Sequence, residues 1–481
     1  MQKSGSRKAV IQMKVVGSSV GASGSRNDRP HKKQKEKDDI ISKLPYSLRS
    51  RILSFLPTKD AARTSVLSRS WTESWTSITK LDLDDSVFHS PKSKKKSGGK
   101  QHFINFVNRA LLLNENYSVE CFSLVITNKY DQTLVNTWIS CMLKKNVKKL
   151  SIASSLEFPF SALTSRSLFN NAYYLEELVL KMRCCAINVP PCGYYHSFGK
   201  LKLLKLCGII FTIDKSIKIL LPVLKKFETK NCSWLSAHVV TLELKAPLLE
   251  SVFIDQDLES VTREPRNCKI KFSDSSLKEF TYCGDGISQA IVLSDPSSAR
   301  NVAANIILYK RGNSVQESGS YACLLLNQFS QVKCMKFHGS EVLTQPNMVL
   351  LPKFAMLTHL DLGSVSDEVL LCLLQKSPVL NTLVFKEITK CDQERLSSVV
   401  VPNCLASTLQ VVKFGNLHGH EHELFLAKYL MENGIVLERM SFSFANAWQI
   451  DSKVIEEFKE KLYSFKKGVS FAILEFSFDY Y

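Results

Sequence analysis

Apolar residues recur along most of the chain in the pattern L-x-x-L-x-L, with other apolar residues as common replacements. Most intervals between successive matches are 23–29 residues, and one interval, from Leu277 to Val332, is about twice as long. Because side chains alternate along a strand, each match predicts a short strand with one apolar side. The matches are Ile78/Leu81/Leu83, Cys121/Leu124/Ile126, Val147/Leu150/Ile152, Leu175/Leu178/Leu180, Leu201/Leu204/Leu206, Leu224/Phe227/Thr229, Leu249/Val252/Ile254, Leu277/Phe280/Tyr282, Val332/Met335/Phe337, Leu357/Leu360/Leu362, Leu380/Leu383/Phe385, Leu409/Val412/Phe414 and Leu437/Met440/Phe442, with a weaker one at Ala303/Ile306/Leu308.

This period and pattern are typical of leucine-rich repeats. One repeat cannot bury its own apolar side, so neighbouring repeats must stack. The sequence therefore predicts an α/β fold, a curved solenoid with a parallel sheet on its concave side. The rest of each repeat is expected to return as a helix or a turn. An all-helical core does not fit the strand-like triplets.

Residues 39–75 have a different periodicity, that of short amphipathic helices. Pro45 suits the first turn of a helix, and Pro57 ends that helix because the residue before a proline avoids helical geometry. Thr58 is then the expected N-cap of a second helix. The apolar residues at helical spacing in the first helix are Leu48, Ile52, Leu53 and Leu56.

Val66, Leu67, Trp71 and Trp75 continue this helical pattern. A segment of about 40 residues is at the lower limit for independent folding and cannot bury this much apolar surface alone. Its apolar face must dock on a partner or on the rest of the chain. Periodicity alone leaves both alternatives open, since a helical cap on the following domain has the same pattern.

The net charge of +18 lies mostly in two segments. Residues 1–37 hold ten Lys or Arg and two acidic residues, and residues 91–100 hold five Lys and no acidic residue. The remaining residues are nearly balanced, which argues against the basic stripe of a nucleic-acid-binding surface. Both basic segments are poor in apolar residues and are expected to be disordered. Their lysine clusters suit either nuclear import or solvated linkers.

No motif of an active site is found. The sequence lacks a phosphate-cradling loop, a nucleophile elbow and an H-E-x-x-H pair. Fourteen cysteines are scattered without metal-ligand spacing, as expected for reduced, mostly buried thiols. His418, His420 and His422 alternate beside Glu423, but acidic residues there also suit the start of a helix over 424–432. We therefore expect no catalytic residue, no cofactor and no metal.

The chain has no secretory signal and no apolar run of membrane-spanning length. We expect a location in the nucleus, the cytoplasm or both, with no membrane contact. The predicted target-binding surface is the concave face, whose side chains flank the inward ones. The candidates there are Lys149, Glu177, Lys205, Lys226, Glu228, Phe253, Asp255, His359 and Asp361.

Residues 39–75 resemble an F-box in the form that plants use. The resemblance rests on Leu44-Pro45, the run 52–59, the run 64–68 and Trp71. It implies docking on the Skp-type linker subunit of a cullin scaffold. The residues expected to contact the linker are Leu44, Pro45, Leu48, Ile52, Leu53, Leu56, Pro57, Val66, Leu67 and Trp71. The sequence departs from the family at Arg49 and Ser50, where leucines are common, and at Ser70, where a basic residue is usual. Each lost leucine would remove up to about 2 kcal/mol of apolar burial if that position contacts the partner.

Residues 401–442 resemble the FBD segment of plant F-box proteins, on matches that include Val401-Pro402, the run 426–430 and the run 436–440. We expect a basic disordered tail at 1–37, an F-box at 38–80, degenerate leucine-rich repeats at 81–400 with a lysine-rich insertion at 91–100, and an FBD-like C-terminal cap with the last repeats at 401–481. The resemblance implies a non-catalytic substrate receptor of a cullin-type (SCF) ubiquitin ligase that binds an unknown protein target. The alternatives are a repeat scaffold outside the ubiquitin pathway and, less favoured, nucleic-acid association through the basic tail.

Overall fold

The computed structural model divides the chain into a unit of residues 1–44 and a unit of residues 45–481. The described residues are 43–67, 69–88, 96–113, 119–157, 162–190, 198–256, 266–284, 290–293, 300–309, 315–445, 450–466 and 473–478. Only residues 43 and 44 of the first unit are described. The expected basic tail, 1–37, and the lysines before residue 96 lie outside the described residues.

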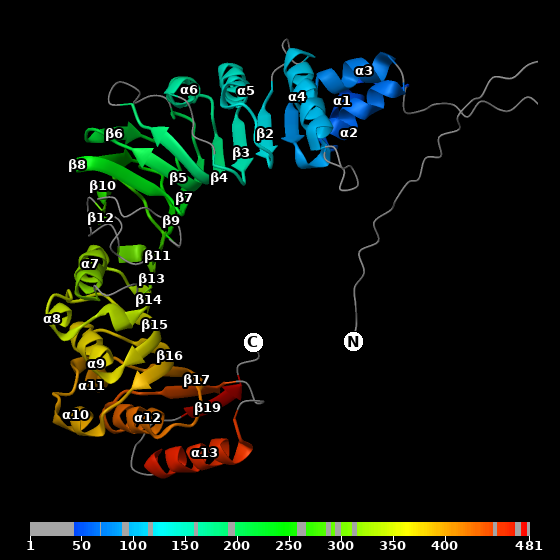
Figure 1. Cartoon of the computed structure of the whole chain (residues 1–481). Coiled ribbons are helices and arrows are strands. Elements are labelled where there is room, and N and C mark those ends of the chain that lie inside the picture. The colour runs from blue at the N-terminus through cyan, green and yellow to red at the C-terminus, as the bar shows by residue number, and fades with distance from the viewer. Residues whose placement is uncertain are drawn as a thin grey trace, which may run out of the picture. The chain divides into compact units, whose positions relative to one another are not determined.

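The second unit begins with three short helices (Figure 1). They are α1 (Tyr46–Leu53), α2 (Thr58–Arg63) and α3 (Arg69–Thr76). Pro45 and Pro57 each stand at the N-cap of the following helix, where the missing N–H costs nothing. The second helix thus begins at Thr58, which we expected to be its N-cap. Thr58 instead uses its hydroxyl in a contact with the first strand.

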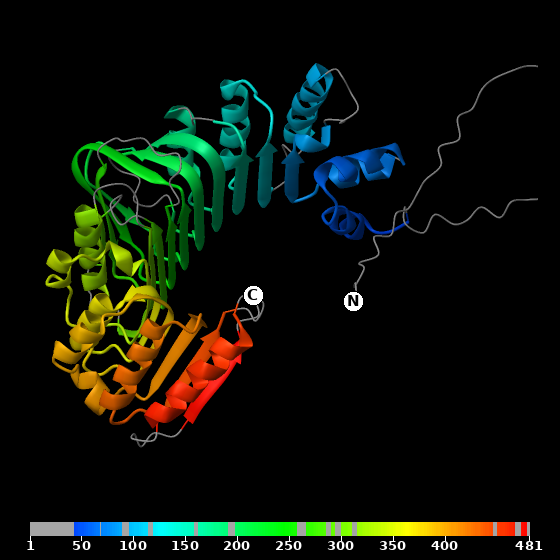
Figure 2. The ribbon, with the colours of Figure 1, turned by 60° about the horizontal axis from the view of Figure 1, so that its bottom comes forward.

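A long parallel sheet follows, in which strands lie side by side in chain order (Figure 2). This confirms the predicted parallel repeat fold. The strands of this main sheet are β1 (Lys80–Asp84), β2 (Cys121–Ile126), β3 (Lys149–Ser154), β4 (Glu177–Asn188), β5 (Leu203–Thr212), β7 (Lys226–Lys230), β9 (Ser251–Asp255), β11 (Glu279–Gly284), β13 (Ala303–Leu308), β14 (Cys334–His338), β15 (His359–Ser366), β16 (Thr382–Lys390), β17 (Val411–Leu417), β18 (Arg439–Phe444) and β19 (Ile473–Phe478).

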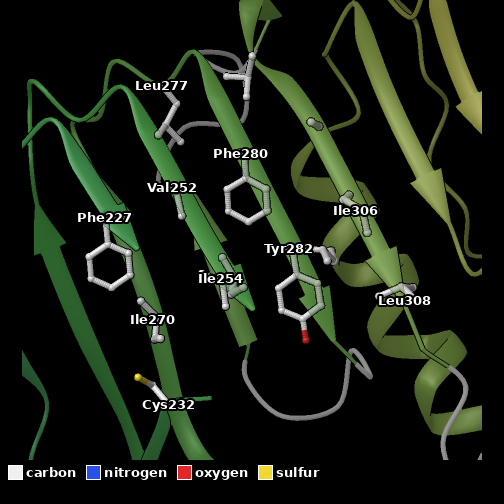
Figure 3. Packing of buried hydrophobic residues seen from close by; sticks show 14 of the residues in the cluster. Phe227, Cys232, Val252, Ile254, Ile270, Leu277, Phe280, Tyr282, Ile306 and Leu308 are labelled. Carbon is white, nitrogen blue, oxygen red and sulfur yellow. The ribbon is translucent and has the colours of Figure 1, made fainter. Parts of the chain in front are cut away.

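The apolar residues of successive strands stand in register and form continuous columns. One column runs through Leu81, Phe122 and Leu150 to Met440 and Leu474. Figure 3 shows its middle part, where Phe227, Val252 and Phe280 project from neighbouring strands into the core. Each strand buries the apolar face that its neighbour needs, as expected for stacked repeats.

Two of the predicted triplets have the wrong phase. Phe122, not Leu124, pairs with Leu81 and Leu150, and Cys121 lies outside the core column. Likewise Ala304, not Ile306, pairs with Phe280. In both strands three alternate residues are apolar and buried, so a pattern shifted by two residues fits the sequence equally well.

Helices cover one face of the sheet, and the other face carries none in the described part of the chain (Figure 1). This bare face is the one predicted to be concave and is called the helix-free face below. The covering helices are α4 (Lys96–Leu113), α5 (Gln132–Lys144), α6 (Ala162–Asn171), α7 (Val315–Gln328), α8 (Gln345–Met348), α9 (Asp367–Lys376), α10 (Gln393–Ser398), α11 (Asn403–Ser407), α12 (Glu421–Asn433) and α13 (Ser452–Lys466). Residues 96–100, expected to be disordered, form the first turn of α4.

In the middle of the chain the return segments are strands instead of helices. They are β6 (Ile217–Leu220), β8 (Ser233–Lys245), β10 (Arg266–Ser273) and β12 (Ala290–Leu293), and they pair in parallel as a second, outer sheet. Phe272 of this outer sheet meets Phe227 of the main sheet edge to face, with ring centroids 5.5 Å apart. The middle repeats are therefore a two-sheet sandwich.

The solenoid continues after the helix of the FBD-like segment. Helix α12, expected to cover the last strands, is followed by β18, α13 and β19. Strand β19 extends the main sheet beyond β18 in an unbroken parallel register. The structure thus adds one repeat that the leucine pattern did not predict.

Candidate functional site

The three N-terminal helices bury one side and expose the other. Leu53, Trp71 and Trp75 belong to the core of the chain, with exposed fractions of 1%, 4% and 4%. Ala61 of α2 is buried with them. Leu53 and Trp71, which we predicted to contact the linker, are therefore core residues without a free surface. Their helical spacing gave no means of telling which side would face inward.

The other apolar residues of these helices form an exposed surface. Phe55 and Val66 are 79% and 86% exposed, and Leu67 is 60% exposed. Exposed apolar patches on proteins often mark sites of interaction with a partner. We call this surface the exposed F-box face; its residues are Leu48, Ile52, Phe55, Leu56, Val66 and Leu67. Pro45 and Pro57 are also exposed, and Leu44 of the first unit is half-buried.

Phe55 was missing from the predicted contact residues. It follows Leu48 and Ile52 at positions i+7 and i+3, the spacing of one helix face. The signal was present in the sequence, but the helix was expected to present Leu53 instead. The chain in fact leaves α1 after Leu53, and Phe55 points away from the core.

The residues that depart from the F-box pattern lie beside this surface. Two nitrogens of the Arg49 guanidinium, Nε and Nη1, are buried and form no hydrogen bond within the described residues. The Ser50 hydroxyl accepts a hydrogen bond of 3.2 Å from the Ser77 hydroxyl. The side chain of Ser70 lies outside the described residues.

The second helix is fastened to the first strand of the sheet. The buried Thr58 hydroxyl accepts a hydrogen bond of 2.6 Å from the backbone N–H of Asp82 in β1. The Lys59 ammonium donates to the carbonyl of Val87 and lies 4.0 Å from the ring centroid of Phe88. The Thr58 contact satisfies a backbone N–H at the outer edge of β1, and the Lys59 contacts hold the turn that follows the strand.

On the helix-free face, six of the nine predicted target-binding residues form ion pairs across neighbouring strands, four of them with one another. Lys149 and Glu177 lie 2.6 Å apart, and Lys205 pairs with Glu228. Asp255 accepts from Lys230 at 3.2 Å, and Asp361 lies 3.6 Å from Lys336 and 3.7 Å from the His338 ring. These ion pairs satisfy charges that we had expected to face a target.

Three of the predicted residues form no side-chain hydrogen bond or ion pair within the described part of the chain: Lys226, Phe253 and His359. Phe253 is an exposed aromatic ring at the middle of this face, on β9. Its neighbours in register are Glu228 and Thr281. An exposed aromatic residue between polar ones is typical of an interface hot spot.

The histidine-rich segment serves as a helix cap. The buried Glu423 carboxylate accepts hydrogen bonds from the backbone N–H groups of His418, Gly419 and His420, at 2.8–3.1 Å. The His422 ring nitrogen Nε2 lies 2.9 Å from the carbonyl of Ile388. Among the described residues, no group of three or more His, Cys, Asp or Glu side chains is placed to hold a metal ion.

The described thiols are free and mostly shielded from water. Burial raises the pKa of Cys232 to about 12 and that of Cys268 to about 11. Because the thiolate is the reactive form, such buried thiols are poor nucleophiles. They fit the repeats as small apolar residues.

Together, the N-terminal helices and the stacked parallel strands define a protein that joins a small helical docking module to a leucine-rich-repeat solenoid. The F-box family model matches residues 41–82, and the FBD family model matches residues 398–442. An F-box/FBD/LRR-repeat protein of Arabidopsis thaliana is 27% identical over 442 residues, which covers 90% of this chain and 92% of that protein. An F-box/LRR-repeat protein of the same plant is 27% identical over 431 residues, covering 84% of this chain and 87% of the relative.

The chain thus matches F-box and FBD family models near its two ends and is similar over most of its length to F-box/FBD/LRR-repeat proteins of Arabidopsis thaliana. Its exposed helical face lies within the segment matched as an F-box. Strands β17 and most of β18, with helices α11 and α12, lie within the segment matched as FBD. No helix in the described part of the chain is long and apolar enough to cross a membrane.

Proposed function

We propose that this chain is a non-catalytic substrate receptor of a cullin-type (SCF) ubiquitin ligase. The observation that carries the proposal is the exposed F-box face. Burying Phe55, Val66 and Leu67 against a partner would contribute about 1.5–3 kcal/mol for each side chain. The partner that an F-box implies is the Skp-type linker subunit, itself bound to the cullin. Proteins of this family are typically non-catalytic adaptors.

In this proposal the repeats hold a target protein on the helix-free face. Phe253, Lys226 and His359 are the favoured contacts because their side chains are not already paired. The receptor contributes proximity, since a bound target experiences a high effective concentration of the conjugating enzyme's thioester. We assign the F-box to 38–80, the repeats to 81–400 and the FBD-like end to 401–481. The expected location is the nucleus, the cytoplasm or both.

The test is capture of the full chain by a purified Skp-type linker subunit. Replacing Val66 and Leu67 together with Lys should reduce binding by at least about tenfold, because two apolar contacts are lost and two charges are placed at the interface. A matched control is available in Val349 and Leu350, which are 79% and 61% exposed but lie far from α1–α3 in the repeat region. The same double substitution there should leave linker binding unchanged.

The proposal would be contradicted if the linker subunit did not capture the chain, or if it captured the two double variants equally well. It would favour the alternative of a repeat scaffold that acts outside the ubiquitin pathway. Circular dichroism of both variants checks that the fold is intact. Both pairs are exposed, so neither substitution should unfold the chain.

A further inference from the structure

The two edges of the main sheet are treated differently. At β1 the outer edge is met by α2, whose Thr58 hydroxyl accepts a hydrogen bond from the N–H of Asp82. Lys59 of α2 contacts the carbonyl of Val87, just beyond the strand. At the other end, β19 pairs with β18, and no described residue pairs with its second edge. An unpaired strand edge presents a row of N–H and C=O groups that another strand can join.

The hydrogen-bonding direction of β19 follows from one contact. The N–H of Ile473 donates to the carbonyl of Glu438 on the β18 side, at 3.2 Å. In a parallel pair, alternate residues point their backbone groups to the same side. Residues 473, 475 and 477 therefore face β18, whereas Leu474, Phe476 and Phe478 point their N–H and C=O groups outward.

The side chains of β19 are also incompletely covered. Met440 and Phe442 of β18 are fully buried, but their register partners Leu474 and Phe476 are only half-buried. Phe478 is exposed although it contacts Phe444, with ring centroids 6.1 Å apart. Strand β19 holds no Pro, no Lys and no bulge, which are features that usually prevent pairing at a sheet edge. Its one charged residue, Glu475, lies 3.2 Å from Arg439 of β18.

We propose that β19 is a self-association site at which a second copy of this chain adds its own β19 antiparallel, about a two-fold axis through Phe476. This register places Phe476 opposite its counterpart and Leu474 opposite Phe478, so that outward backbone groups and half-covered apolar side chains meet. Glu475 then lies opposite Ser477 of the second copy. Moving the axis by one residue, to Glu475, would oppose two carboxylates, which disfavours that register.

The first experiment is sedimentation equilibrium of the full chain at concentrations up to about 100 µM, which detects a Kd in the micromolar range. We expect a monomer–dimer equilibrium. Ser477→Glu sets a new carboxylate against Glu475 twice per dimer and should weaken the dimer by about 2- to 30-fold. Ser477→Lys should strengthen it by a similar factor. Ser151→Glu is the control, on the same face of β3, a strand paired on both sides.

The register is tested by disulfide trapping in a chain whose exposed Cys334 is replaced by Ser. Residues 475 and 477 form a non-hydrogen-bonded pair, with Cα atoms about 4.5 Å apart, within reach of a disulfide. A mixture of Glu475→Cys and Ser477→Cys chains should give the mixed disulfide dimer. Efficient homodimers of Glu475→Cys would show the other register and overturn the proposal. A chain that stays monomeric, or a dimer insensitive to Ser477→Glu, would overturn it as well.

Discussion

Arg49 illustrates how one residue can cost stability at the edge of a functional surface. Two of its guanidinium nitrogens are buried without a hydrogen bond among the described residues. A buried polar group without a partner costs about 1–3 kcal/mol by mutational measures. A leucine, which the F-box resemblance leads us to expect at this position, would not carry this cost.

Arg49→Leu should therefore raise the free energy of unfolding, by about 1–3 kcal/mol. Urea denaturation followed by circular dichroism measures the change. Arg51→Leu is the control, because Arg51 is exposed on the same helix and should change stability by less than about 0.5 kcal/mol. A loss of stability in Arg49→Leu would mean that the guanidinium has a stabilising role in the fold.

At the scale of elements, two glycines have opposite roles. Gly208 lies in β5 with φ of +66°, and a Cβ added there would come within 1.9 Å of the carbonyl oxygen of Met182. The glycine permits both the left-handed backbone and the close approach of β4. Gly98 lies in α4 with no neighbour within 4 Å of such a Cβ, so it only weakens the helix.

The same substitution should thus have opposite effects at the two sites. Gly98→Ala should stabilise by about 0.5–1 kcal/mol, since alanine favours the helix. Gly208→Ala should destabilise by more than about 2 kcal/mol, because strain and a backbone clash add. Thermal unfolding of both variants against the parent measures this. Equal shifts in the melting temperature would contradict the assignment of β5.

The sequence predicted most strands of the main sheet but not the structure of the segments that connect them. A leucine triplet marks a strand wherever inward residues alternate, so the strands from β14 to β18 follow from spacing alone. The outer sheet was missed because a return segment with apolar residues satisfies a helix and a strand alike. Ile217 and Ile219 do alternate, but four residues are too few to distinguish the two.

The site was predictable to a similar extent. Helical spacing located the exposed F-box face, yet it could not separate exposed Ile52 from buried Leu53, because adjacent residues differ only by 100° around a helix. The pairing of Lys205 with Glu228 was within reach of the sequence. The triplets Leu201/Leu204/Leu206 and Leu224/Phe227/Thr229 align Leu204 with Phe227, which is the register observed between β5 and β7.

At the scale of the whole molecule, the buried apolar columns contribute more to stability than the ion pairs do. The ion pairs between successive repeats, such as Lys148 with Glu120 and Lys202 with Glu176 just before the strands, are about half exposed to water. Exposed pairs contribute about 0–1 kcal/mol each and are screened by salt. The columns of buried leucine, phenylalanine and valine are insensitive to screening.

Raising NaCl from about 0.05 to about 1 M should consequently lower the melting temperature by no more than about 3 °C. Differential scanning calorimetry at constant pH measures it. The melting temperature of the Lys149→Ala variant, which lacks the exposed ion pair with Glu177, should be similar at both salt concentrations. A fall in the melting temperature of more than about 10 °C would mean that the ion pairs are the main interaction between repeats.

The hydrogen bond between Thr58 and Asp82 has a mechanical consequence. Because the second helix is fixed to β1, a pull on the N-terminal helices is delivered to the first strand and from there along the stack. The load then falls on one row of interstrand hydrogen bonds at a time, in a peeling mode, while strands farther along bear little of it. A chain stretched between residue 45 and β19 should accordingly yield at low force and in a series of small steps, one repeat after another.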